Sequence, residues 1–253
     1  MFDVFASFTP GTLLFLSAVL FVAGCVRGFA GFGAGMIYMP VATTLIFPPT
    51  AAAGFLALDL ILALPLVVKA VRLCDWRTII PAVIGSTIFV HVGTWFIATM
   101  DVLLLRWIIF FIVAAVLILL ISGWRYKRAP TPPISFGVGA VAGILGGVSQ
   151  VAGPPVVAFW LSSARQPAIV RANLIVFFAI ASIGTVFAYW LRDFFTLDVV
   201  RLLITGIPVY GLGLYLGSTG FKNADPKLYR IIAYSLIAIA VVTSMPALDP
   251  YLR

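Results

Sequence analysis

Two glycine-interrupted apolar stretches carry the residue types that could bind a small anion. The first covers residues 27–40 and holds four glycines, and the second covers residues 143–155 and ends in two prolines. Each glycine costs a helix interior about 1 kcal/mol relative to alanine, so both stretches predict a break in an apolar helix. A broken helix offers free backbone N–H groups and positive dipole ends, which suit an anion without any fixed charge.

We expect the two breaks to line one binding site together, because paired glycine-interrupted segments mark the binding sites of transporters. Ser149 and Gln150 would donate side-chain hydrogen bonds to substrate oxygens, and Arg27 would attract the anion. Two alternatives stay open: the glycines only let helices pack closely, and Arg27 only snorkels to an interface. The candidate residues are Arg27, Gly31, Phe32, Gly33, Gly146, Gly147, Ser149, Gln150, Gly153 and Asn173.

Asp59 is the acidic residue that the sequence places near the middle of a membrane. It lies about nine residues into the apolar segment 51–71. Inserting a carboxylate at the centre of a membrane helix costs roughly 2.5–3.5 kcal/mol, so a carboxylate kept at this depth suggests a functional role. It could carry a coupling proton, because burial favours the neutral form of a carboxyl group. It could instead pair with a cation such as Arg27, or serve only structure. Asn173 lies beside its counterpart in the second half and is a candidate for binding substrate or for bridging helices.

The composition establishes the class of protein that these stretches belong to. The chain has 253 residues, of which 63% are hydrophobic and only 9% charged, with a mean hydropathy of +1.18. A soluble domain has about 25% charged residues, so the sequence predicts a polytopic protein whose partner is the lipid bilayer. The net charge of +8 does not indicate nucleic acid here, because an excess of Lys and Arg in cytoplasmic loops sets membrane topology.

Catalytic and metal-binding patterns are not apparent. The chain has one histidine and two cysteines without metal-like spacing, which predicts neither a hydrolytic triad nor a disulfide framework. We therefore expect no enzyme activity, no metal and no cofactor.

A helix of about 20 apolar residues crosses the hydrocarbon core of a membrane. With this length as the criterion, each half of the chain divides into five helical elements. Segment 153–163 is roughly 16 Å long at 1.5 Å per residue, too short to cross, so we expect a half-helix that returns with its predecessor as a hairpin. Its counterpart in the first half, segment 33–47, is expected to be longer. The number of segments that cross the membrane therefore lies between seven and ten. The predicted elements are 11–30, 33–47, 51–71, 78–98 and 102–122, then 134–149, 153–163, 168–191, 199–219 and 228–246.

The two halves show an internal repeat. At an offset of 115 residues, Gly28, Gly31 and Pro40 match Gly143, Gly146 and Pro155. After an insertion the offset becomes 124 residues, and matched Gly, Asp and Arg residues continue at element boundaries. These later pairs are Arg77 with Arg201, Gly93 with Gly217, Asp101 with Asp225, and Arg106 with Arg230.

Charge predicts that the repeats have opposite orientations. Positive residues flank the loop near residues 69–77 in the first half, but in the second half they flank the loops near 165–171 and 222–230. Because positive loops are cytoplasmic, we predict inverted repeats at 1–124 and 134–253, joined by a cytoplasmic linker at 125–133, with both termini outside. Inverted repeats are typical of transporters that work by alternating access.

The duplicated glycine turns, each followed by an apolar run and a proline, together with the basic central linker, resemble the TauE/SafE family of sulfite exporters. The resemblance covers nearly the whole chain. It implies transport, most often export, of small sulfur-containing or organic anions such as sulfite, sulfonates and sulfoacetate across the inner (plasma) membrane. An uncoupled anion channel and a non-transporting scaffold or assembly factor remain alternatives, and a homodimer stays open because lipid-facing residues resemble a dimer interface.

Overall fold

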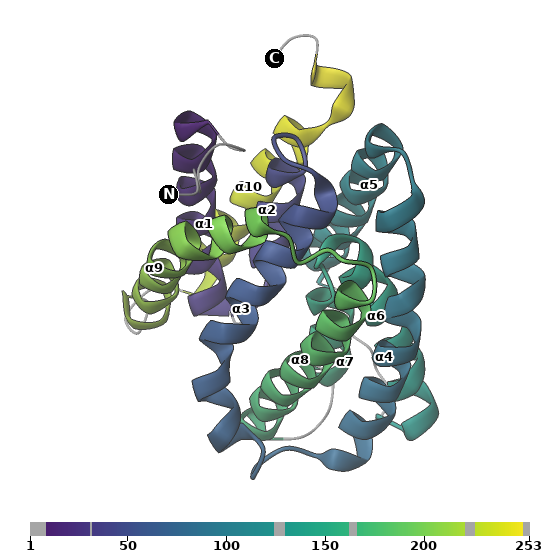
Figure 1. Cartoon of the computed structure of the whole chain (residues 1–253). Helices are drawn as coiled ribbons and strands as arrows, with labels where there is room; N and C mark the ends of the chain where they lie inside the picture. Colours follow the sequence, from purple (N-terminus) through teal and green to yellow (C-terminus); the bar gives the residue numbers. More distant parts are fainter. Residues whose placement is uncertain (1–8, 31, 124–129, 162–165, 221–225, 250–253) are drawn as a thin grey trace.

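The computed structural model describes residues 9–30, 32–123, 130–161, 166–220 and 226–249. Within these ranges the chain forms ten α-helices and a short 3₁₀ turn (Figure 1), which confirms the all-helical prediction. The first five helices are α1 (Pro10–Ala30), α2 (Ala34–Ala42), α3 (Pro48–Ala70), α4 (Trp76–Thr99) and α5 (Val102–Ile121). The others are α6 (Pro132–Ser149), α7 (Gly153–Leu161), α8 (Pro167–Trp190), α9 (Leu197–Gly220) and α10 (Pro226–Ser244), with the 3₁₀ turn at Pro246–Leu248.

Proline and aspartate explain where most of these helices begin. The helices α1, α3, α6, α8 and α10 each start at a proline, whose fixed φ suits the first helical turn and whose missing N–H has no partner there. At α5 the side chain of Asp101 accepts hydrogen bonds from the backbone of Leu103 (2.8 Å) and Leu104 (3.3 Å), a typical N-cap. Apart from the segment 33–47, the predicted boundaries agree with the structure to within a few residues.

The helix after the first break is shorter than the sequence suggested. We expected an element over 33–47, longer than its counterpart in the second half, but α2 and α7 both have nine residues. After α2 the backbone N–H groups of Thr44 and Leu45 bond to the carbonyls three residues earlier, Val41 (3.2 Å) and Ala42 (3.0 Å), so the chain forms a turn before Pro48 starts α3. A nine-residue helix is roughly 13 Å long, and seven of the described helices are long and apolar enough to cross a membrane.

Helices from the two halves pack in pairs. The helix α1 lies along α9 on one flank, α4 lies along α6 on the other, and α3 contacts α8 between them (Figure 1). Gly28 contacts the carbonyl of Leu214 on α9, and Gly143 contacts the carbonyl of Ser86 on α4, so a Cβ at either glycine would collide with backbone. Close approach of this kind is typical of small residues between membrane helices. These two glycines therefore serve packing.

The outward faces of the helices are apolar. On α4 the residues Ile80, Ile84, Ile88 and Val92 follow each other at intervals of four and are 40–55% exposed, which places them on one side of the helix. Ser86, Val90 and Thr94 on the opposite side are buried. An apolar stripe of this size suits lipid rather than water, so α4 turns its polar and small residues inward.

Candidate functional site

The two predicted helix breaks meet in the structure. Gly33 caps the start of α2 with φ +95°, and Gln150 caps the end of α6 with φ +56°, both in the left-handed region. Gly35 contacts the backbone carbonyl of Gln150, and a Cβ on Gly153 would lie 3.2 Å from the Cβ of Phe32. The breaks thus lie directly against each other, although they are more than 100 residues apart in the sequence.

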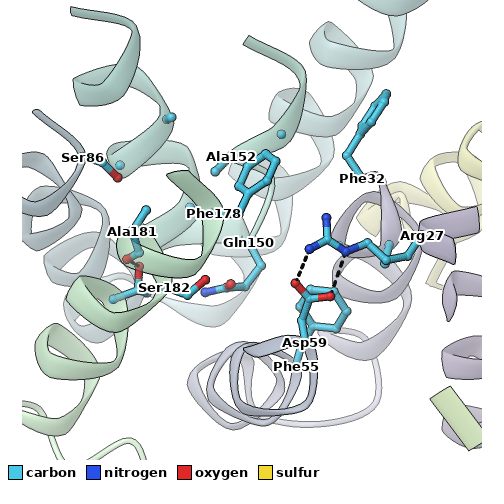
Figure 2. Close-up of a pocket in the computed structure, with 18 residues that line it drawn as sticks. Arg27, Phe32, Phe55, Asp59, Ser86, Gln150, Ala152, Phe178, Ala181 and Ser182 are labelled. Atoms are coloured by element: carbon cyan, nitrogen blue, oxygen red, sulfur yellow. Dashed lines mark hydrogen bonds and ion pairs between the residues drawn. The ribbon is translucent and has the colours of Figure 1, made fainter. Parts of the chain in front are cut away.

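A cavity of about 70 Å³ lies where the breaks meet. On the same measure about 10–15 Å³ holds one water molecule, so the cavity has room for several waters or for one small anion. Figure 2 shows the side chains that line it. They come from α1 (Arg27), the first break and α2 (Phe32, Gly33, Ala34, Gly35), α3 (Phe55, Asp59), α4 (Ser86), α6 (Ala142, Gly143, Gly146), the second break and α7 (Gln150, Ala152, Gly153) and α8 (Phe178, Ala181, Ser182, Thr185).

One side of the cavity holds a two-pronged ion pair. Arg27 Nε donates to Asp59 Oδ1 (2.9 Å), and Arg27 Nη2 donates to Asp59 Oδ2 (2.8 Å), as the dashed lines in Figure 2 show. Tyr210 from α9 donates its hydroxyl to the same carboxylate (2.7 Å). Two parallel charge-assisted bonds fix the guanidinium plane, and the ring of Phe178 lies 5.6 Å below its central carbon. Arg27 is therefore oriented from three helices.

Gln150 is fixed at the second break. Its Nε2 donates to the hydroxyl of Tyr189 (3.0 Å), and this hydroxyl donates to the carbonyl of Gly147 (2.8 Å). Because a tyrosine hydroxyl has a single proton, the bond to Gly147 determines that Gln150 must be the donor in the other bond. The amide orientation follows from this chain, and it holds the left-handed turn against α8.

Three hydroxyl groups line the far side of the cavity, and they differ in their bonding. Thr185 donates to the carbonyl of Ala181 (3.0 Å), one turn earlier in α8. The hydroxyls of Ser86 and Ser182 have no hydrogen-bond partner within the described part of the chain. Ser86 as a residue is only 3% exposed, but its hydroxyl is not among the fully buried polar atoms without a partner, so the hydroxyl is accessible from the cavity.

Seven residues predicted from the sequence line this cavity. They are Arg27, Phe32, Gly33, Asp59, Gly146, Gln150 and Gly153. Asp59 adopts one of its two expected roles, since it pairs with Arg27, while its role as a proton carrier remains a prediction. Gly31 lies outside the described residues.

Three other predicted residues lie away from the cavity. The hydroxyl of Ser149 donates back to Leu145 (2.8 Å) inside α6. A Cβ on Gly147 would lie 2.7 Å from the carbonyl oxygen of Val90, so Gly147 packs against α4. Asn173 accepts a hydrogen bond from the backbone N–H of Asp75 (2.7 Å) just before α4. It bridges two helical segments, which is the other role that the sequence suggested for it.

Apart from Asp59, sequence reasoning missed the residues that the unbroken helices contribute. Phe178, Ala181, Ser182 and Thr185 line the cavity from α8, at spacings of three, four and seven residues that place them on one helix face. A stripe of small and hydroxyl residues within an otherwise apolar segment was the signal that could have found them. Tyr210 carried no such signal. Among the described residues, no cluster of His, Cys, Asp or Glu could hold a metal ion.

Comparison with known proteins places this architecture in a family. The model of the family described as "Sulfite exporter TauE/SafE" matches residues 16–244. The chain belongs to this family. TauE/SafE membership confirms the resemblance, the transporter class and the multi-pass membrane location, and it agrees with the prediction that the chain is not an enzyme.

A curated TauE/SafE-type relative supports the assignment along the whole chain. The protein "Probable sulfite/organosulfonate exporter TauE" of Cupriavidus necator is 27% identical over 251 residues, covering 94% of this chain and 96% of the relative. No solved structure matches.

Proposed function

We propose that this TauE/SafE member exports small sulfur-containing or organic anions, such as sulfite, sulfonates or sulfoacetate, across the plasma membrane. The observation that carries the proposal is the oriented guanidinium of Arg27 in a cavity that both helix breaks line. A planar guanidinium with a fixed fork matches the oxygens of a sulfonate or carboxylate group. The relative from Cupriavidus necator, whose name includes sulfite and organosulfonate export, supports this class of substrate.

We further propose that transport proceeds by alternating access between two inverted repeats, residues 1–124 and 134–253, with the linker 125–133 in the cytoplasm and both termini outside. The helix pairs support this proposal, because the first helix of each half lies along the fourth helix of the other half. The third helices of the two halves, α3 and α8, contact each other and both line the cavity. Exchange of two equivalent packings would open the cavity to one side and then to the other.

Asp59 gives this cycle a coupling group. Its carboxylate occupies the guanidinium fork of Arg27, the position that a substrate anion would take. A proton on Asp59 would remove its charge and weaken the ion pair, so the anion could replace it. The charge of the site would then stay balanced, because one anion and one proton enter together.

Flux in proteoliposomes tests the proposal. Purified protein would be reconstituted, and uptake of labelled sulfite, a sulfonate and a carboxylate measured with and without a pH gradient. We expect saturable flux of at least one anion and stimulation by the gradient, with stimulation lost in Asp59→Asn. Flux that neither saturates nor responds to the gradient would instead establish an uncoupled channel. No flux from folded, reconstituted protein would favour the scaffold.

A further inference from the structure

Building on the proposed function, we propose that Ser86 and Ser182 form a second subsite that binds an uncharged polar group of the transported anion. The anionic group would lie at Arg27 and a short hydroxyl- or carbonyl-bearing tail at the two serines. Figure 2 shows both serines on the side of the cavity opposite Arg27. They come from α4 and α8, whereas Arg27 and its partner Asp59 come from α1 and α3. We call Ser86 and Ser182 the neutral subsite.

Several hydroxyls in the helices bond to their own helix, whereas the hydroxyls of Ser86 and Ser182 are left to the cavity. A serine or threonine inside a helix commonly donates to the carbonyl three or four residues earlier. Thr94, Ser149 and Thr185 all do this. Ser86 and Ser182 do not, and neither has another hydrogen-bond partner in the part of the chain described.

Neither hydroxyl is a fully buried polar atom, so water or a substrate in the cavity can supply the hydrogen bond that no protein group makes. Ser86 is 3% exposed and lines the cavity, so a molecule inside that cavity is well placed to supply the bond. Two hydroxyls from two helices can both donate and accept, which suits an alcohol, an ether or a carbonyl.

The wall near the neutral subsite carries no charge. The lining residues on this side, which include Thr185 and the two serines, are all uncharged, so a second anionic group there would meet no cation. Within the cavity lining, the charged side chains are Arg27 and Asp59, and both lie at the opposite end. The neutral subsite therefore favours monovalent anions and disfavours those with a second charge on the tail.

The predicted repeat gives the same division. At the offsets of 115 and 124 residues, Arg27 and Tyr210 correspond to Ala142 and Ser86. All four lie at or beside the cavity, since Tyr210 bonds to Asp59 and the other three line the wall. Arg27 and Tyr210 thus belong to the charged end of the cavity. Their counterparts in the repeat, Ala142 and Ser86, belong to the uncharged end, where Ser86 supplies a hydroxyl.

Three matched anions test the subsite. They are 2-hydroxyethanesulfonate, ethanesulfonate, which lacks the hydroxyl, and ethane-1,2-disulfonate, which replaces it with a second charge. Each would compete with labelled methanesulfonate for uptake into proteoliposomes. One net hydrogen bond is worth roughly two- to tenfold in affinity, so wild type should bind the hydroxylated anion about two- to tenfold more tightly than ethanesulfonate. The disulfonate should compete least.

Variants then assign the preference to the two serines. Ser86→Ala, Ser182→Ala and their double variant should each reduce the preference for the hydroxylated anion, and the double variant should abolish it while still transporting methanesulfonate. Thr94→Val, which removes a hydroxyl bonded within the same helix as Ser86, should leave the preference unchanged. Thermal unfolding would confirm that each variant is folded.

The outcomes distinguish the subsite from the transport function. Saturable uptake of methanesulfonate with no preference in wild type, or with the same preference in the double variant, would overturn the neutral subsite alone. An absence of any saturable uptake by wild type would overturn the proposed function, and the subsite with it.

Discussion

Replacing Asp59 with asparagine tests whether its carboxylate competes with the anion for Arg27. The substitution keeps the size of the side chain but removes the charge that accepts two bonds from Arg27 and one from Tyr210. Arg27 then has a neutral partner, and an entering anion no longer has to displace a carboxylate. The variant should therefore be less stable without anion and should bind anions more tightly.

The magnitudes follow from the geometry of the pair. The side chains of Arg27 and Asp59 are 15% and 19% exposed, so the pair is partly hydrated. Removing one partner of a fully buried pair costs about 3–5 kcal/mol, and we expect about 3 kcal/mol here. Hydrogen bonds to a charged group are each worth about 1.5–3 kcal/mol, so removing this competition should tighten anion binding about ten- to hundredfold.

Thermal unfolding in detergent with increasing methanesulfonate measures both effects. An anion that binds only the folded protein stabilises it in proportion to the logarithm of its concentration over Kd. Asp59→Asn should therefore start with a lower Tm but gain more from the anion than wild type.

A second ion pair supplies the control. Arg106 and Asp249 form the same two-pronged arrangement, at 2.6 Å and 2.8 Å, but neither lines the cavity. Asp249→Asn should lower the Tm without changing the response to anion. If Asp59→Asn responds to anion no more than wild type does, the carboxylate does not compete for Arg27 and the reasoning fails.

Three further predictions concern the surroundings of the cavity. Tyr210→Phe removes one hydrogen bond to Asp59, so it should shift the anion response in the same direction as Asp59→Asn but by less, measured in the same unfolding assay. Gly143→Ala would press a Cβ against the Ser86 carbonyl, whereas Gly137→Ala on the same helix meets nothing within 4 Å; the first should destabilise by about 1–3 kcal/mol and the second should not, and equal Tm values would contradict the packing role. Burial raises the pKa of the Cys74 thiol, which lies in the loop between α3 and α4, so less thiolate forms at a given pH; in a Cys25→Ala background, labelling by an impermeant maleimide should increase up to a higher pH than for free cysteine, and labelling only from outside would contradict the predicted topology.

Helix positions could be predicted largely because the residues that start and cap helices can be recognised in the sequence. Prolines start five helices, and Asp101 caps α5, so apolar length and breakers together set the boundaries. The segment 33–47 was overestimated because its apolar residues continue past the helix end. The backbone forms turns at Thr44 and Leu45 there, and hydropathy does not detect them.

The candidate site could be predicted only where the backbone itself is unusual. Gly33 and Gln150 mark left-handed turns, and glycine or polar residues in apolar runs indicate such turns directly. Rotation about an apolar helix is harder to predict, because both faces are apolar when one meets lipid and the other meets protein. Hence Ser149 was expected in the cavity but bonds within α6, while Ser86 and Ser182 were missed.

Uptake by a charge-balanced variant most directly tests whether the cavity at Arg27 is the transport site. Arg27→Gln combined with Asp59→Asn removes both charges of the pair together, so no buried charge is left unpaired. Reconstituted alongside wild type, the double variant should be folded, by its unfolding transition, yet should show no saturable uptake of an anion that wild type transports. Saturable uptake by the double variant with unchanged KM and kcat would show that the anion crosses the membrane elsewhere.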